Sequence, residues 1–161
     1  MTLFVSAVII TVIVLLDQLI KHWAFTVLAP VQSMIVIPGF LRLTYVENQG
    51  AAFGIFFGQR WLLTVLVAVI LIICCYLLYS KRIARSIERF CITLIIGGGA
   101  GNLIDRIMRG FVVDYIDIND LFQYPMFNLA DCCVVAGAIL MVLAAFFENK
   151  TKTQNMKEMS S

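Results

Sequence analysis

Long stretches without a charged side chain constrain this protein more than any other feature of its sequence. There are five of them, at residues 1–16, 22–41, 61–80, 90–104 and 132–147. A helix that crosses a bilayer needs about 20 mostly apolar residues. Four of the stretches reach that length, three of them by including polar residues at their ends. We therefore predict membrane-spanning helices at about residues 3–26, 60–80, 88–108 and 128–147.

The remaining stretch, residues 22–41, does not suit a spanning helix. It contains Pro30, Pro38 and Gly39, and proline removes a backbone donor and breaks a helix. Because backbone groups without partners are not tolerated against lipid, we expect extended chain outside the hydrocarbon from about Val27 onwards. The β-branched and aromatic residues that follow are typical of short strands. We predict a small β-rich segment, an outer cradle, at about residues 31–59.

The composition supports a membrane protein and excludes several other classes. Hydrophobic residues make up 61% of the 161 residues and charged residues 14%, whereas soluble domains have about 45–50% and about 25%. A net charge of +2 is too small for nucleic-acid binding. The predicted fold class is an all-α polytopic membrane protein with four transmembrane helices and a small extracytoplasmic β-rich segment between helices 1 and 2. We expect one domain at residues 1–148 and a polar cytoplasmic tail at residues 149–161.

The distribution of basic residues predicts the orientation of the helices. The loop at residues 81–89 holds four basic residues and the tail holds three lysines, whereas the segments at about 27–59 and 109–127 hold one basic residue each. Short loops rich in lysine and arginine stay on the cytoplasmic side of a membrane. We therefore expect both termini in the cytoplasm and the β-rich segment outside.

Charged residues within the predicted spans mark candidate functional positions, because charges are costly inside a membrane. Asp17 and Lys21 are four residues apart and share one face of the first span. They form either an ion pair that reaches the outer interface or a pair that faces the bundle interior and supports a site. Near the outer end of the third span we expect Asp105 to pair with Arg106 in a supporting role. An aspartate held by an arginine is a poor proton carrier.

Asp114 and Asp131 lie on either side of one short outer loop, so the predicted topology brings both to the same membrane face. Asn128 can cap the fourth helix, which places Asp131 in its first turn. Two carboxylates in a partly dry site do not both ionise easily, so one can act as general acid and the other as general base toward an amide bond. Aspartates at helix ends are also common as simple caps, and spacing alone leaves both interpretations open.

The remaining features indicate packing rather than chemistry. Gly97 and Gly101 have the spacing that lets membrane helices approach closely. The five cysteines lie in predicted spans, where we interpret them as small apolar side chains. His22 is the single histidine, which leaves no histidine-based metal cluster.

Five short blocks, together with four spans and this length, resemble the lipoprotein signal peptidase (signal peptidase II) family. The resemblance covers about residues 10–147. In chain order the blocks are Asp17-Gln18-Leu19-Ile20-Lys21, Asn48-Gln49-Gly50-Ala51-Ala52-Phe53, Gly101-Asn102-Leu103-Ile104-Asp105-Arg106, Val112-Val113-Asp114-Tyr115 and Phe127-Asn128-Leu129-Ala130-Asp131.

The resemblance implies an aspartic endopeptidase of the bacterial plasma membrane, with Asp114 and Asp131 as its catalytic pair. Such an enzyme removes the signal peptide of prolipoproteins just before a cysteine that carries diacylglycerol. We expect a monomer in contact with membrane lipids, without metal, organic cofactor or nucleic acid, and a short extracellular helix over the site at residues 115–127. The implied supporting or substrate-binding residues are Asp17, Lys21, Asn48, Gly50, Asn102, Asp105, Arg106 and Asn128.

Two other functions remain open on the residues alone. Four spans with membrane carboxylates also suit a small proton-coupled transporter, although transporters tend to place their key charges near the midplane. A non-enzymatic membrane scaffold with capped helices is the other, and it would tolerate Asp114→Asn.

Overall fold

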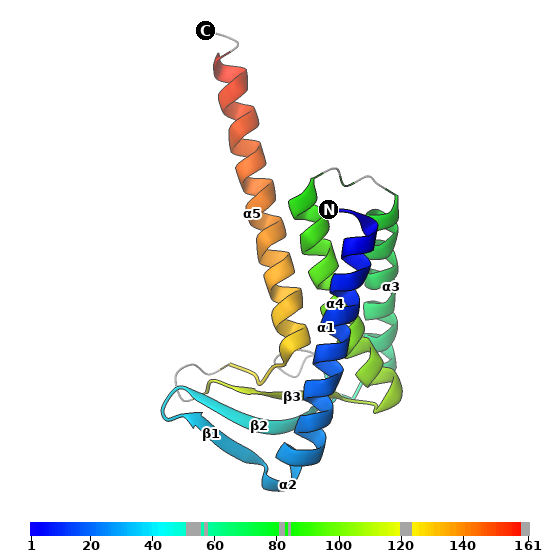
Figure 1. The fold of residues 1–161 in the computed structure, drawn as a ribbon, viewed down its shortest axis with the longest axis vertical. Coiled ribbons are helices and arrows are strands. Elements are labelled where there is room, and N and C mark those ends of the chain that lie inside the picture. The colour runs from blue at the N-terminus through cyan, green and yellow to red at the C-terminus, as the bar shows by residue number, and fades with distance from the viewer. Residues whose placement is uncertain (51–55, 57, 81–82, 84, 120–123, 159–161) are drawn as a thin grey trace.

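The computed structural model describes residues 1–50, 56, 58–80, 83, 85–119 and 124–158, the last ten of these (149–158) by their backbone only. Within them, four helices are long and apolar enough to cross a membrane, and a three-stranded sheet lies at one end of the bundle (Figure 1). The predicted fold class is confirmed. The elements are α1 (Leu3–Trp23), η1 (Ala24–Leu28), α2 (Ala29–Val31), β1 (Ser33–Ile37), β2 (Leu41–Asn48), α3 (Arg60–Tyr79), α4 (Ser86–Met108), β3 (Val112–Asp117) and α5 (Leu129–Glu158).

The first span runs further than predicted. The helix does not end near Val27: α1 passes into the π-helical segment η1, and α2 carries Pro30 before the chain turns at Gln32 with φ +64°. In η1 the Ala29 N–H donates to the carbonyl of Ala24, five residues back. A widened turn of this kind accommodates an irregularity in a helix. Because Pro30 follows it, the missing proline N–H disturbs only the last helical turn.

Helix α4 packs against α1, α3 and α5, and glycines let two of these neighbours approach it closely. Gly97 and Gly101 both face α1: a methyl group at Gly97 would lie 3.0 Å from an isoleucine side chain, and one at Gly101 would meet the Asp17 carboxylate. The predicted packing role of this glycine pair is confirmed. A methyl group at Gly98 would collide with the backbone carbonyl of Ala130 in α5.

The β-rich segment supplies two strands of the sheet, and the third comes from a region where we expected none. The strands are antiparallel in the order β1-β2-β3. The short helix expected at residues 115–127 is wrong where it can be checked, because residues 115–117 belong to β3 and residues 118–119 and 124–127 are not helical. Residues 120–123 lie outside the described residues. Valine and tyrosine suit a strand, and β2 provides the hydrogen-bonding partner.

Side chains of β3 alternate between two environments, as a strand requires. Val113 and Tyr115 pack against Ala24 and Leu28 at the end of the first span. Asp114 points the other way, toward the space between the helices. The sheet therefore rests on the first span and presents Asp114 to the bundle.

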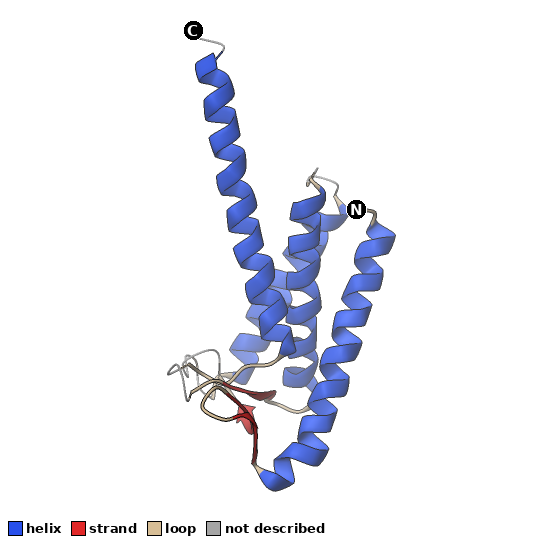
Figure 2. Ribbon diagram, turned by 60° about the vertical axis from the view of Figure 1, so that its left-hand side comes forward, coloured by secondary structure: helices blue, strands red, loops and turns tan. Residues whose placement is uncertain are grey.

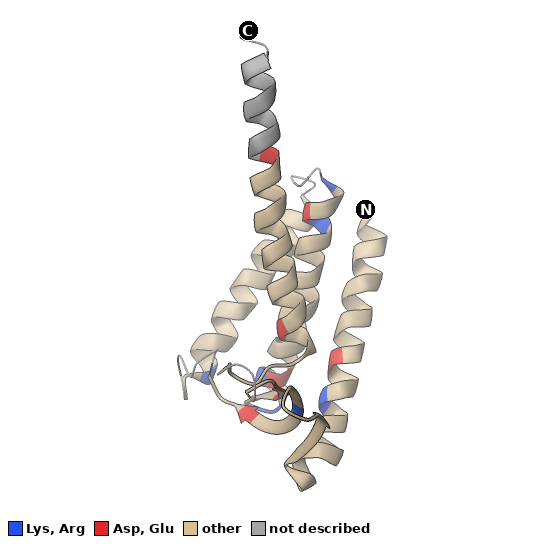
Figure 3. Ribbon diagram, turned by 90° about the vertical axis from the view of Figure 1, so that its left-hand side faces the viewer, with Lys and Arg blue, Asp and Glu red and all other residues tan. Residues whose placement is uncertain are grey.

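Both chain termini lie at the end of the molecule opposite to the sheet (Figure 2). Charged residues occur near that end of the helices and again in the half nearer the sheet (Figure 3). Arg85 pairs with Glu148, and Arg89 donates to the carbonyl of Met1. These contacts join the start of α1, the start of α4 and residue 148 of α5 at one end of the bundle, while the cytoplasmic location of both termini stays a prediction. Helix α5 continues to Glu158, so much of the predicted polar tail is helical.

Candidate active site

Asp114 of β3 and Asp131 of α5 line the same cavity, which has a volume of about 320 Å³. Asp114 is buried, whereas Asp131 is partly exposed. The cavity lies among α3, α4 and α5 and is apolar over most of its wall. Its other lining residues are Asn48, Val67, Ile70, Leu71, Ile95, Gly99, Asn102, Arg106, Val112, Tyr124, Pro125, Met126, Phe127, Val134 and Val135.

Asn128 connects the two carboxylates. Its side-chain amide donates to Asp114 Oδ1 at 2.7 Å. The Oδ1 of Asn128 accepts from the backbone N–H of Asp131 at 2.9 Å, and the backbone N–H of Asn128 donates to Asp131 Oδ2 at 3.2 Å. This reciprocal pattern is a helix cap, so the predicted capping role of Asn128 is confirmed. One buried residue therefore sets the position of Asp114 relative to the start of α5.

The first backbone N–H groups of α5 all have partners. The N–H of Leu129 donates to the Tyr115 hydroxyl at 3.1 Å, and the N–H of Ala130 donates to Asp17 Oδ1 at 3.1 Å. Such groups have no partner within their own helix. Because β3 and α1 supply these acceptors, the helix end that carries Asp131 is held from two other elements.

Two asparagines complete the hydrogen bonding of the pair. Asn48 donates to Asp114 Oδ2 at 2.8 Å, and Asn102 donates to Asp131 Oδ1 at 2.7 Å. Asn48 reaches Asp114 because Val46 pairs with Asp114 across the sheet, which places residue 48 diagonally opposite on the same face. Each carboxylate therefore accepts two hydrogen bonds from the described residues.

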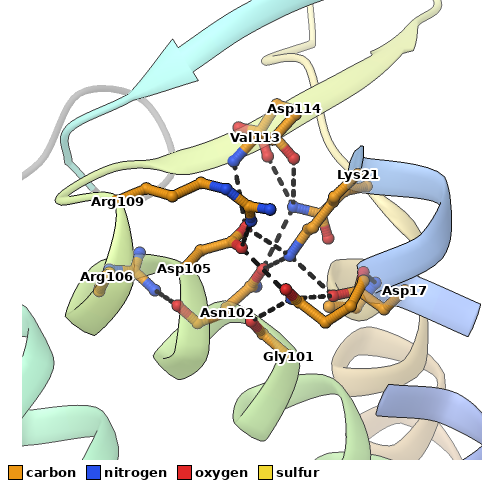
Figure 4. Close-up of polar contacts among 12 residues, drawn as sticks. Asp17, Lys21, Gly101, Asn102, Asp105, Arg106, Arg109, Val113 and Asp114 are labelled. Carbon is orange, nitrogen blue, oxygen red and sulfur yellow. Dashed lines mark hydrogen bonds and ion pairs between the residues drawn. The ribbon is translucent and has the colours of Figure 1, made fainter. Parts of the chain in front are cut away.

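Behind the pair, Asp17, Lys21 and Asp105 form a cluster with no exposed side-chain surface (Figure 4). The Lys21 ammonium lies 2.9 Å from Asp17 and 3.0 Å from Asp105, and it donates to Asn102 Oδ1 at 2.7 Å. Lys21 and Asp17 thus face the bundle interior, as one of the two interpretations predicted. The alternative of an ion pair at the outer interface is wrong.

The predicted pairing of Asp105 with Arg106 is also wrong. Asp105 forms its ion pairs with Lys21 and with Arg109. Arg106 instead donates to the backbone carbonyls of Asn102 at 3.5 Å and Gly50 at 3.1 Å. Consecutive helical side chains point about 100° apart, whereas residues four apart share a face. The supporting role of Asp105 stays a prediction, and the cations that it pairs with are Lys21 and Arg109.

Gly50 joins the site through its backbone. Its N–H donates to Asn48 Oδ1 at 2.9 Å, and its carbonyl accepts from Arg106. Residues 51–53 of the same sequence block lie outside the described residues.

The pKa of Asp114 is raised to about 7: burial and, after it, the nearby charge of Asp131 raise it, whereas hydrogen bonds from Asn48 and Asn128 and the charge of Lys21 act to lower it. At neutral pH this carboxyl group therefore exists in both protonation states.

Within the described part of the chain, no three histidine, cysteine or acidic side chains gather as a metal ion would require.

Comparison with known proteins identifies the family of this chain. The model of the signal peptidase (SPase) II family matches residues 9–147. The chain belongs to the signal peptidase II family. Signal peptidases are proteases, which decides against the transporter and scaffold interpretations.

Named relatives of this signal peptidase II chain match along most of their length. The lipoprotein signal peptidase of Syntrophomonas wolfei is 40% identical over 144 residues, which cover 89% of this chain and 93% of the relative. That of Clostridioides difficile is 39% identical over 145 residues, covering 89% and 97%.

Solved structures of bacterial membrane enzymes share the fold. One has a TM-score of 0.86 at 33% identity and covers 93% of this chain and 92% of its own. Another has a TM-score of 0.79 at 34% identity, with 89% and 93% covered.

Three contributors to this signal peptidase II site were not predicted. Gln18 donates to Asp105 at 3.2 Å, Arg109 pairs with Asp105, and Tyr115 accepts from α5. The spacing of Asp105 and Arg109 is a signal that could have found the second, since acid and base four residues apart share a helix face. Tyr115 stood in the sequence block around Asp114, but its contact with α5 could not be predicted because it depends on the strand pairing of β3.

Proposed function

We propose that this protein is an aspartic lipoprotein signal peptidase in which Asp114 and Asp131 perform hydrolysis. The observation that carries the proposal is the placement of both carboxylates on one cavity wall, joined through Asn128. The family membership of the chain and the names of its relatives support the same reaction.

The two carboxyl groups have different surroundings, which favours different roles. Asp131 lies in the first turn of α5, where the helix dipole stabilises a negative charge, and it is open to the cavity. We assign it the role of general base. Asp114 is buried and its pKa of about 7 lets it keep a proton, so we assign it the role of general acid.

The reaction then needs only water and the two side chains. Asp131 takes a proton from water as the water oxygen attacks the scissile carbonyl carbon, and Asp114 gives its proton to the carbonyl oxygen. A gem-diol forms. As the C–N bond breaks, the proton on Asp131 passes to the leaving nitrogen and a gem-diol hydroxyl returns its proton to Asp114. The resting state is restored and one water has been consumed.

The cavity suits a substrate with an apolar helix next to a polar scissile bond. Its lining combines aliphatic residues of α3 and α5, including Val67, Ile70 and Val134, with the polar side chains of Arg106 and Asn48. The signal peptide would lie along the aliphatic wall, and the diacylglycerol on the substrate cysteine would stay in the bilayer. Arg106 carries additional N–H groups that can hold the substrate backbone.

We further propose that the enzyme works as a monomer in the bacterial plasma membrane with its termini in the cytoplasm. The basic loop and the tail lysines support this orientation. The sheet and the two carboxylates then lie at the outer face, where a prolipoprotein is modified.

Purified variants test the proposal on a diacylglyceryl prolipoprotein. We expect Asp114→Asn and Asp131→Asn each to abolish cleavage while the protein still inserts and folds, and we expect the substrate without lipid to be cleaved poorly. Asp117→Asn is the matched control, because Asp117 belongs to the same strand but is hydrogen-bonded to Thr44 and Asn119 away from the cavity. Near-normal turnover in either of the first two variants would refute the assignment.

A further inference from the structure

The side-chain amide of Asn102 has only one orientation that satisfies its neighbours. Its Oδ1 accepts from the Lys21 ammonium at 2.7 Å and from the Asn128 amide at 3.2 Å, while its Nδ2 donates to Asp131 Oδ1 at 2.7 Å. The reversed amide would set N–H groups against two donors and an oxygen against a carboxylate. Lys21 and Asn128, which donate to the oxygen of the Asn102 amide, therefore ensure that its nitrogen donates to Asp131.

Lys21 is the stronger of the two donors that impose this orientation. It is completely buried, and its three N–H bonds are directed to Asp17, Asp105 and Asn102. An ammonium group has three donors and no acceptor, so it cannot tolerate an N–H of Asn102 in that place. Asn128, in contrast, also donates to Asp114 and to a backbone carbonyl.

The cluster around Lys21 is balanced without the catalytic pair. Asp17 and Asp105 carry two negative charges, and Lys21 and Arg109 carry two positive charges. No hydrogen bond or ion pair joins Lys21 to Asp114 or Asp131 among the described contacts, and Lys21 does not line the cavity. Its hydrogen-bonded path to the reacting groups runs through Asn102, and its positive charge also acts on Asp114 through space.

We infer that Lys21 is a positioning residue for hydrolysis: by fixing the amide of Asn102 it keeps a hydrogen-bond donor directed at Asp131. This inference rests on the proposed role of Asp131 as general base. The donor holds the carboxylate of Asp131 at the angle from which it meets the attacking water. Lys21 is completely buried and does not line the cavity, so we expect it to influence the chemical step and not substrate binding.

A double-mutant cycle separates this role from a purely structural one. In the cleavage assay with purified enzyme and a diacylglyceryl prolipoprotein, we expect Lys21→Met to lower kcat by about 10- to 100-fold, as loss of a supporting partner typically does, with KM changed by less than about threefold. Asn102→Ala should lower kcat to a similar extent. In the Asn102→Ala protein, Lys21→Met should lower kcat by much less than it does in the wild type, because residues that act through one another are not additive.

Two further variants keep the outcome decisive. Leu78→Ala, in the buried cluster at the other end of the bundle, is the stability control: it should lower the melting temperature, as core truncation does, and leave kcat unchanged. If Lys21→Met does not fold, the cycle is run in an Asp17→Asn protein, where the cluster keeps the Asp105–Arg109 ion pair and becomes neutral once Lys21 is replaced by Met.

Additive losses in the double variant, or a rise in KM with unchanged kcat, would overturn the inference. Those results leave the proposed function intact, because that depends on Asp114→Asn and Asp131→Asn. Turnover by these two variants would instead remove the basis for both.

Discussion

Replacing Asp105 by asparagine tests whether the buried charges behind the site stabilise the fold as a balanced set. Asp105 has no exposed surface and accepts hydrogen bonds from Lys21, Gln18, Arg109 and the backbone N–H of Val113. Asparagine keeps one acceptor oxygen in place of two. The substitution also leaves two cations facing the single carboxylate of Asp17.

The expected loss follows from that imbalance. Removing one partner of a buried ion pair destabilises a protein by roughly 3–5 kcal/mol. At roughly 2–4 °C per kcal/mol for a chain of this size, the melting temperature of Asp105→Asn in detergent should fall by about 10 °C. The Asp105→Asn/Arg109→Gln variant restores neutrality, because Asp17 and Lys21 remain as a pair. It should regain part of the lost stability.

Thermal unfolding of the three purified proteins, followed together with residual cleavage, is the assay. Glu88→Gln is a suitable control, since Glu88 lies at the far end of α4 and remains partly exposed beside Arg85. A double variant no more stable than Asp105→Asn would show that charge balance is not what holds this cluster. A complete loss of turnover without any change in melting temperature would contradict the supporting role of Asp105.

Two other predictions concern pH and packing. In the proposed mechanism Asp114 donates a proton and its pKa is about 7, so kcat/KM should fall as the pH rises through about 7. Asn48→Ala removes a hydrogen-bond donor that favours the ionised form of Asp114, so this fall should move to higher pH. A move to lower pH in the pH–rate profile would contradict the role of Asp114 as general acid. Gly98→Ala should lower stability by about 1–3 kcal/mol, as overpacking does, because its methyl group meets a backbone carbonyl. Gly99→Ala, which meets only the flexible end of Leu71, should cost less in the same melting experiment.

The spans and the meeting of Asp114 with Asp131 could be predicted from the sequence because both follow from where charges are absent. Four apolar stretches fix how often the chain crosses the membrane, and two residues flanking one outer loop must then lie on one face. Asn128 could be recognised as a cap because that role is local, requiring only its own helix start.

The features that could not be predicted depend on contacts between distant segments. Strand β3 forms because β2, more than 60 residues earlier, offers it hydrogen-bonding groups, and a short apolar run does not reveal such a partner. The ion pairs of Asp105 were misassigned because adjacency in sequence is not adjacency on a helix surface. The continuation of the first span through Pro30 depends on the π-helical turn before it, which no residue pattern indicates.

The hydrogen bond between Asp17 and the N–H of Ala130 connects the first membrane helix to the last. A nascent chain that has inserted only three helices already contains Asp114 but has neither Asp131 nor the helix end that Asp17 holds. On the proposed mechanism, proteolytic competence therefore arises only after the last membrane helix has been made and has docked on the first.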